Sequence, residues 1–264
     1  MRRRNLLGVE VCATDYVEAC EAIRVAAAER RPFAVTALAV HGVMTGALDK
    51  EHRRRLNALD MVVPDGQPVR WGLNALYGDG LRDRVCGPKL MLDVCAMAER
   101  EGLRIGFYGN KAAVLEVLQR NLLQRFPGLL VAVSIPSRFG RVDPEEQAEL
   151  ARTIAASGTE ILFVGLGCPR QEVWVFENRS RLNIPILAVG AALDFHAGKL
   201  SLAPQWMQDR GLEWAFRLWQ EPKRLWRRYL LLNPLYLTML AAQKLGLRRY
   251  TAVSGGPVPY EGYA

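Results

Sequence analysis

Two hydrophobic patterns alternate along most of the chain. Short runs of apolar and β-branched residues predict strands, and the stretches between them repeat apolar residues at helical spacing. The predicted strands are 33–38, 60–63, 104–108, 129–133, 160–165 and 185–190. The predicted helices are 16–29, 50–56, 69–76, 89–100, 112–125, 144–156 and 171–182. Strands separated by such helices imply βαβ units, so we expect an α/β fold with a mostly parallel sheet and helices on both faces.

Polar residues and glycines follow several of the predicted strands. Open α/β sheets bind ligands beyond the carboxyl ends of their strands, where these turns meet at one edge. The turns contain Thr36, Asp65, Gly109-Asn110, the segment GLGCPRQE at 165–172, and 189–196. We therefore expect the functional site at that edge.

Asp65 is the first candidate for chemistry. It follows the apolar run Val62-Val63-Pro64 and precedes Gly66. A carboxylate at the rim of a sheet is partly desolvated, which raises its pKa toward the range useful to a general base. The alternative is an Asx-turn, or the N-cap of the helix that starts near Pro68. The local spacing leaves both interpretations open.

Glycines also stand between strand and helix at 109–110 and 165–167. Free backbone N–H groups at such helix starts attract phosphate. However, GLGCPR lacks the third glycine of the dinucleotide fingerprint, and Pro169 stands where the helix would begin. A nicotinamide site is therefore only weakly indicated, and an ordinary turn is the alternative.

The segment 205–250 has a composition typical of a membrane surface. It holds Trp206, Trp214, Trp219 and Trp226, and its nine Lys/Arg and three Asp/Glu give +6 of the chain's formal +8. Indole rings prefer the bilayer interface, and clustered cations are attracted to anionic lipid. The apolar stretch 230–242 is broken by Asn233-Pro234 and is shorter than the about 20 residues that a spanning helix needs. We expect this segment to lie on a bilayer, to cover an anionic ligand, or both.

Composition excludes several other classes of protein. Five cysteines form an odd set without a CxxC pair, which argues against a disulfide framework and a structural zinc site. No nucleic-acid recognition signature accompanies the basic charge. The N-terminus is basic but no apolar signal-peptide core follows it, so we expect a cytoplasmic location. We divide the chain into a core at 1–204, an appendage at 205–250 and a Gly/Pro-rich disordered tail at 251–264.

The chain contains no Asp-x-Asp triplet, the paired carboxylates with which many enzymes hold a sugar-nucleotide diphosphate through a metal. Arginines would have to neutralise a diphosphate instead. The candidates are Arg84, Arg217, Arg224 and Arg227. The last three would share an arc of about 80° on one unbroken helix, but Pro222 indicates a break. A lipid-facing stripe is the alternative for each of them.

Several segments together closely resemble the WecG/TagA/CpsF family of bacterial glycosyltransferases (glycosyltransferase family 26). The resemblance extends over about 9–245. Its most specific stretches are ALDMVVPDGQPVRW at 58–71, DRVCGPKLM at 83–91, GLGCPRQEVW at 165–174, and 190–229 with the following Asn233-Pro234.

The resemblance implies a Rossmann-like core with a basic C-terminal helical appendage that contacts the membrane. It implies inverting transfer of a sugar, without metal or other cofactor, from a UDP-sugar to a polyprenyl-diphosphate-linked sugar in polysaccharide or teichoic acid assembly. Asp65 matches the proposed catalytic base. The residues implied around it are Thr36, Arg84, Gly109, Gln171 and Asp194 at the active site, Arg217, Arg224 and Arg227 at the diphosphate, and Trp219, Trp226 and Arg228 at the membrane.

Three departures from the family pattern leave the donor sugar open among N-acetylmannosamine, glucose and glucuronic acid. A usual Thr-x-Asn reads Thr36-Ala37-Leu38, and Lys89 stands before Leu90 where many members carry an acidic residue. The segment 39–42 keeps only the histidine of a common polar run.

We therefore expect a glycosyltransferase at the inner face of the cell membrane, with no nucleic-acid partner. The oligomeric state stays open, a homo-oligomer included. The first alternative is a non-catalytic peripheral module that binds anionic lipid, which would leave Asp65 and Gln171 without a task. The second is a nicotinamide-dependent dehydrogenase, against which the broken glycine fingerprint counts.

Overall fold

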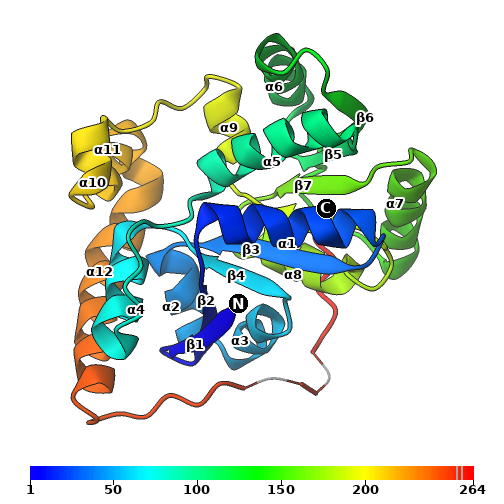
Figure 1. The fold of residues 1–264 in the computed structure, drawn as a ribbon. Helices are drawn as coiled ribbons and strands as arrows, with labels where there is room; N and C mark the ends of the chain where they lie inside the picture. Colours follow the sequence, from blue (N-terminus) through cyan, green and yellow to red (C-terminus); the bar gives the residue numbers. More distant parts are fainter. Residues whose placement is uncertain (254, 257) are drawn as a thin grey trace.

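A six-stranded parallel sheet forms the centre of the molecule (Figure 1). The computed structural model describes residues 1–253, 255–256 and 258–264. The strands are β3 (Phe33–Leu38), β4 (Met61–Pro64), β5 (Arg104–Gly109), β6 (Leu130–Ile135), β7 (Ile161–Gly165) and β8 (Pro185–Ala188). Their order is β4-β3-β8-β7-β5-β6, and every neighbouring pair is parallel. The predicted α/β fold with a parallel sheet is confirmed.

Helices cover both faces of this sheet, because alternate strand residues point to opposite sides and both sets are apolar. One buried cluster joins the sheet to α1 (Tyr16–Ala28), α5 (Gly87–Glu101), α6 (Ala112–Arg125) and α9 (Ala192–His196). The other joins it to α2 (Val40–Leu48), α3 (Lys50–Asn57), α4 (Gln67–Tyr77), α7 (Pro144–Ala156), α8 (Arg170–Asn178) and α12 (Pro222–Lys244).

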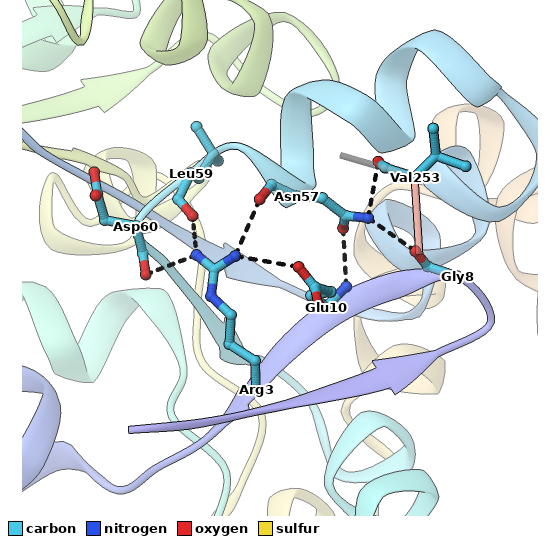
Figure 2. Close-up of polar contacts among 7 residues, drawn as sticks. All are labelled: Arg3, Gly8, Glu10, Asn57, Leu59, Asp60 and Val253. Carbon is cyan, nitrogen blue, oxygen red and sulfur yellow. Dashed lines mark hydrogen bonds and ion pairs between the residues drawn. The ribbon is translucent and has the colours of Figure 1, made fainter. Parts of the chain in front are cut away.

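An N-terminal hairpin, β1 (Arg2–Leu6) with β2 (Val9–Ala13), was not among the predicted strands. Figure 2 shows how it is attached. Arg3 donates to the carbonyl oxygens of Asn57, Leu59 and Asp60. The side chain of Asn57 donates to the carbonyl oxygen of Gly8 and accepts from the backbone N–H of Glu10. The hairpin is therefore held by these hydrogen bonds and by its buried Leu6, Leu7, Val9 and Val11, and not by strand pairing with the main sheet.

The segment 205–250 forms three helices that pack on the core. They are α10 (Gln205–Asp209), α11 (Glu213–Gln220) and α12. Tyr236 of α12 is buried, and its hydroxyl donates to the carbonyl oxygen of Pro68 at 2.9 Å. Gln243 donates to the carbonyl oxygen of Asn5 and accepts from the backbone N–H of Leu7. The appendage is thus joined to α4 and to the hairpin by buried contacts.

The expected break at Asn233-Pro234 is wrong, because α12 is continuous through Pro234. Pro234 lies on the exposed face, where water can satisfy the carbonyl group that the proline leaves unpaired. The expected break at Pro222 is present, since α11 ends at Gln220 and Pro222 opens α12. Within the described chain, no helix is both long and apolar enough to cross a bilayer.

Several described residues of the tail 251–264, which composition predicts to be disordered, contact the core; residues 254 and 257 lie outside the described residues. Glu261 pairs with the buried Arg55 at 2.8 Å. Ser137 donates to the carbonyl oxygen of Ala264, and the backbone N–H of Val142 donates to that of Gly262. The last two contacts join the tail to the loop between β6 and α7. Composition alone does not reveal these long-range partners.

Candidate active site

A cavity of about 750 Å³ opens at the carboxyl edge of the sheet. Asp65 after β4, Asn110 after β5, Gly165 to Cys168 after β7 and Gly190 after β8 all line it. The opposite wall comes from α11 and α12, through Glu213, Arg217, Arg224, Leu225, Arg227, Arg228, Leu231 and Leu232. The expected convergence of the strand-end turns is therefore confirmed, and the basic appendage closes the site.

The helices that start at this edge leave their first N–H groups free of side-chain caps. In the described chain, α2, α4, α6, α8 and α9 each begin within a few residues of a strand end, and no side chain caps any of them. By contrast, α1, α3 and α7 are capped by Asp15, Asp49 and Asp143. Uncapped helix starts carry partial positive charge, so their concentration at one edge suits an anionic ligand.

Close backbone approach explains the glycine at position 109. Gly109 has φ of 112°, and a Cβ there would lie 2.7 Å from the backbone of Gly165 on the neighbouring strand. Asn110 follows with φ of 59° and is buried at the cavity wall. Gly109 therefore shapes the cavity through the backbone, since only a residue without a Cβ fits between β5 and β7.

Asp65 lies where this cavity meets a second, smaller one of about 110 Å³ and lines both. Its side chain is 24% exposed, and its Oδ1 lies 4.0 Å from Nη1 of Arg84. Burial raises the pKa of Asp65 to about 6; Glu213 acts in the same direction, whereas Arg84 and Arg217 oppose it. The N-cap of α4 is Gly66, so the alternative role of Asp65 as that cap is wrong.

Other candidate bases at this edge are less suitable. Burial, with Arg228 and His52 acting in the same direction, lowers the pKa of His41 to about 3, so its imidazole is a weak base. His196 is held by the carbonyl oxygen of Pro88 at 2.8 Å. Asp194 lines the larger cavity but is paired with Lys199 at 3.0 Å, and it does not cap α9.

Gln171 lies in the wall of the larger cavity, and Thr36 lies behind that wall. Thr36 is fully buried, and its hydroxyl donates to Oε1 of Glu172 at 3.0 Å. Gln171 lines the cavity, and its Nε2 donates to the same oxygen at 2.8 Å. The two predicted residues are thus brought together by a third, Glu172, which the sequence analysis did not single out.

The smaller cavity contains Arg84 and a set of aromatic and amide side chains. Arg84 is buried, pairs with Glu213 at 2.5 Å and donates to Oε1 of Gln208 at 3.1 Å. Trp214 and Tyr229 lie against each other, with ring centroids 6.0 Å apart. The cavity is completed by Ala39, Val40, His41, Asp65, Gly66, Gln67, Pro68, Gly211, Arg217, Arg228 and Asn233. Aromatic faces beside amide groups are a composition that suits a sugar ring.

The predicted diphosphate arginines come from two helices but share one cavity. Arg217 on α11 is half-buried, stacks on the ring of Phe195 at 5.3 Å and lies 3.4 Å from Glu221. Arg224 on α12 pairs with the same carboxylate at 2.7 Å, and Arg227 also lines the cavity. Arg228, predicted to contact the membrane, lines both cavities instead.

The tryptophans of the appendage divide into two groups. Trp206, Trp219 and Trp226 are exposed, Trp219 by 77%. Trp214 is half-buried in the wall of the smaller cavity. Exposed indoles on basic helices are the pattern expected for a membrane surface, whereas Trp214 faces the site.

Sequence reasoning missed two acidic residues of the site. Glu172 follows Gln171 directly in GLGCPRQE, and Glu213 is one of only three acidic residues in 205–250. An acidic residue inside a basic segment was the available signal for Glu213. For Glu172 the signal was a glutamate that directly precedes the apolar run Val173-Trp174-Val175.

A parallel α/β sheet with uncapped helix starts and a basic wall at one edge forms a site that suits an anionic ligand. The model of the Glycosyl transferase WecG/TagA/CpsF family matches residues 4–250, so the chain belongs to this family. The resemblance drawn from 9–245 is confirmed. Membership makes the protein a glycosyltransferase of cell-surface polysaccharide synthesis, a family that uses a nucleotide-sugar donor and a lipid-linked acceptor.

Proposed function

We propose that the protein transfers a hexose, with inversion and without a metal, from a UDP-sugar to a sugar linked to polyprenyl diphosphate. The donor is of the N-acetylmannosamine, glucose or glucuronic acid type. The reaction takes place at the inner face of the cell membrane. The observation that carries the proposal is Asp65, a carboxylate of raised pKa at the junction of two cavities.

The two cavities suggest how the substrates are divided. The larger cavity, with its uncapped helix starts and basic wall, takes the UDP-sugar. The smaller cavity takes the acceptor sugar between Trp214, Tyr229 and Asn233. Oε1 of Gln67 in this cavity is buried and has no hydrogen-bond partner among the described residues, so it supplies an acceptor. Asp65 lines both cavities, so its carboxylate can reach both substrates.

In this arrangement the acceptor hydroxyl attacks the anomeric carbon from the side of Asp65. Its proton passes to the Asp65 carboxylate as the new C–O bond forms, and the bond to the UDP oxygen breaks on the opposite side. The negative charge that develops on UDP is stabilised by helix starts and by Arg217, Arg224 and Arg227. Because a guanidinium can bind two phosphate oxygens at once, arginines can neutralise the diphosphate in place of a metal ion.

The membrane role rests on one face of α12. Trp226, Leu230 and Leu237 fall within an arc of about 40° at 3.6 residues per turn, and all three are exposed. The opposite face buries Leu225, Tyr236 and Met239 in the core. Basic residues flank the exposed face, so the helix lies on anionic lipid with the cavity mouth close to the headgroups.

The test is release of UDP when a panel of UDP-sugars is mixed with a short-chain acceptor analogue carrying one sugar on a lipid diphosphate. One donor of the three types should support release that depends on acceptor. Vesicle binding without UDP release from any donor would favour the non-catalytic alternative instead.

Chelation tests the absence of a metal in the reaction. The missing Asp-x-Asp and the arginine-lined wall lead us to expect that EDTA leaves the rate of UDP release unchanged. Activity that EDTA abolishes and magnesium or manganese restores would mean that a metal holds the diphosphate.

A further inference from the structure

We propose that Glu172 is a positioning residue that turns the amide of Gln171 so that its carbonyl oxygen faces the larger cavity. Gln171 then selects a ligand that presents an N–H or O–H group at that point. The inference rests on the proposed function, because the ligand it concerns is the UDP-sugar.

The geometry begins with a buried carboxylate in the wall of the larger cavity. Glu172 is fully buried in the first turn of α8 and has no cation within ion-pair distance among the described residues. Its Oε1 accepts two hydrogen bonds, from the Thr36 hydroxyl at 3.0 Å and from Nε2 of Gln171 at 2.8 Å. Its Oε2 is buried and unpartnered in the described chain. Burying a carboxylate without a cation lowers the stability of the fold. Its presence here therefore indicates a purpose other than stability.

That purpose follows from hydrogen-bond chemistry. Oε1 of Glu172 accepts from Nε2 of Gln171, so the amide presents its NH₂ group to Glu172. Its carbonyl oxygen, Oε1, therefore points the other way. Oε1 is buried and has no partner among the described residues. An amide oxygen left without a donor in a nearly closed environment indicates a place that a ligand completes.

Position 190, next to this oxygen in the cavity wall, is glycine. A Cβ built on Gly190 would lie 3.5 Å from Oε1 of Gln171, and both residues line the larger cavity. A side chain at 190 would occupy the approach to the amide. With glycine there, a small shift of the Gln171 amide brings the buried Oε1 within reach of a ligand N–H or O–H in the cavity.

On a UDP-sugar, groups of this kind occur in two parts. The uridine offers the imide N–H of its base and the ribose hydroxyls, and the transferred sugar offers hydroxyls or an acetamido N–H. Comparing UDP alone with the complete UDP-sugar separates these sources.

The experiment measures affinity for UDP and UDP-sugar by calorimetry, with KM and kcat, in Glu172→Leu, Glu172→Gln, Gln171→Met and the double variant Glu172→Leu/Gln171→Met. Leucine removes the acceptor that fixes the amide, and methionine removes the amide oxygen itself. Each should weaken donor binding about five- to tenfold, the usual effect of one hydrogen bond, and raise the donor KM more than it lowers kcat. Glu172→Gln keeps an oxygen that can accept and should fall between wild type and Glu172→Leu.

The double variant separates positioning from a merely structural role. If Glu172 acts through Gln171, the double variant loses no more affinity than Gln171→Met alone. Glu160→Gln, at the opposite end of β7, is the matched control and should bind the donor normally. A weaker affinity for UDP itself assigns the contact to the uridine, whereas a loss confined to UDP-sugar assigns it to the sugar.

Normal donor affinity in Gln171→Met, or additive losses in the double variant, would overturn the inference. Should Glu172→Leu fail to fold, the Gln171→Met and Glu172→Gln variants still decide the matter. A wild-type protein that binds neither UDP nor any UDP-sugar would instead count against the proposed function.

Discussion

At the scale of single residues, Asp65 has the largest consequences because burial brings the pKa of its carboxyl group closer to neutral pH. Burial and Glu213 raise its pKa, and the 4.0 Å distance to Arg84 only partly compensates. A base is most effective when its pKa lies near the working pH. Two measurements follow from this one environment.

The first concerns activity. Asp65→Asn keeps the shape of the side chain and removes the base, so kcat should fall by about 10²- to 10⁴-fold, the usual contribution of general-base catalysis. The wild-type rate should rise with pH through about 6, where Asp65 ionises, and the variant should lack this step. UDP release across a pH series measures both. If Asp65→Asn turns over normally while Asp194→Asn does not, the base is assigned to the wrong strand.

The second concerns stability. The folded pKa of Asp65, about 6, lies above its ordinary value of 3.8. The contribution of this group to stability is therefore complete below about pH 4 and is lost as pH rises through 6. The difference between these two pKa values corresponds to about 3 kcal/mol of unfolding free energy, since one pKa unit is about 1.36 kcal/mol. Urea unfolding should show Asp65→Asn gaining stability over wild type between pH 4 and 7. A gap that does not change with pH would contradict the burial argument.

Sequence identified Asp65, Thr36 and Gln171 as residues of the edge because each lies at a strand end or helix start. It did not identify Glu172 or Glu213. Their place at the site depends on contacts between distant segments: Glu172 with Thr36, and Glu213 with Arg84. Partners separated by more than a hundred positions have no local signature in one sequence.

At the scale of helices and strands, the wall made by α11 and α12 is the proposed binding surface for the diphosphate. Arg217→Lys keeps the charge but loses the forked geometry that matches phosphate oxygens. On a soluble short-chain acceptor, where membrane contact has no effect, the variant should lose about tenfold or more in kcat/KM. Arg248→Lys, outside both cavities, is the matched control. Equal activity of the two variants would mean that Arg217 does not serve the diphosphate.

The long, strongly patterned helices and the buried parallel strands were predictable from sequence because their apolar periodicity is set by burial. The hairpin was not, since β1 opens with three arginines and one of them, Arg3, acts by binding carbonyl oxygens. Helix α2 was also missed. Its sequence VHGVMTGAL contains two glycines that are kept because Leu38, Val9 and Leu56 leave no room for a Cβ. Packing, rather than local preference, decides that element.

At the scale of the whole molecule, truncating the chain is not a clean test of membrane binding by the appendage. Tyr236 and Leu225 are buried against the core, and the chain beyond α12 returns to Asn57 and Arg55. Removing 205–264 would therefore expose core surface as well as remove the proposed membrane face. Substitutions confined to exposed residues avoid this difficulty.

The last prediction uses such substitutions on α12. Trp226→Ala, Leu230→Ala and Leu237→Ala together remove the exposed apolar face while leaving Tyr236 and Met239 in place. Full burial of one such side chain is worth about 1.5–3 kcal/mol, so partial insertion of three should make the variant bind phosphatidylglycerol vesicles at least about tenfold more weakly. Added salt should also weaken vesicle binding by the wild-type protein, because charges on exposed arginines are screened beyond about 8 Å at physiological ionic strength. The control replaces Val17 and Leu130, exposed apolar residues on other elements, by alanine. Turnover of a soluble acceptor should be unchanged in both proteins, since neither set of residues lines a cavity. Vesicle binding that is the same for the α12 variant and the control would mean that this helix does not face the bilayer.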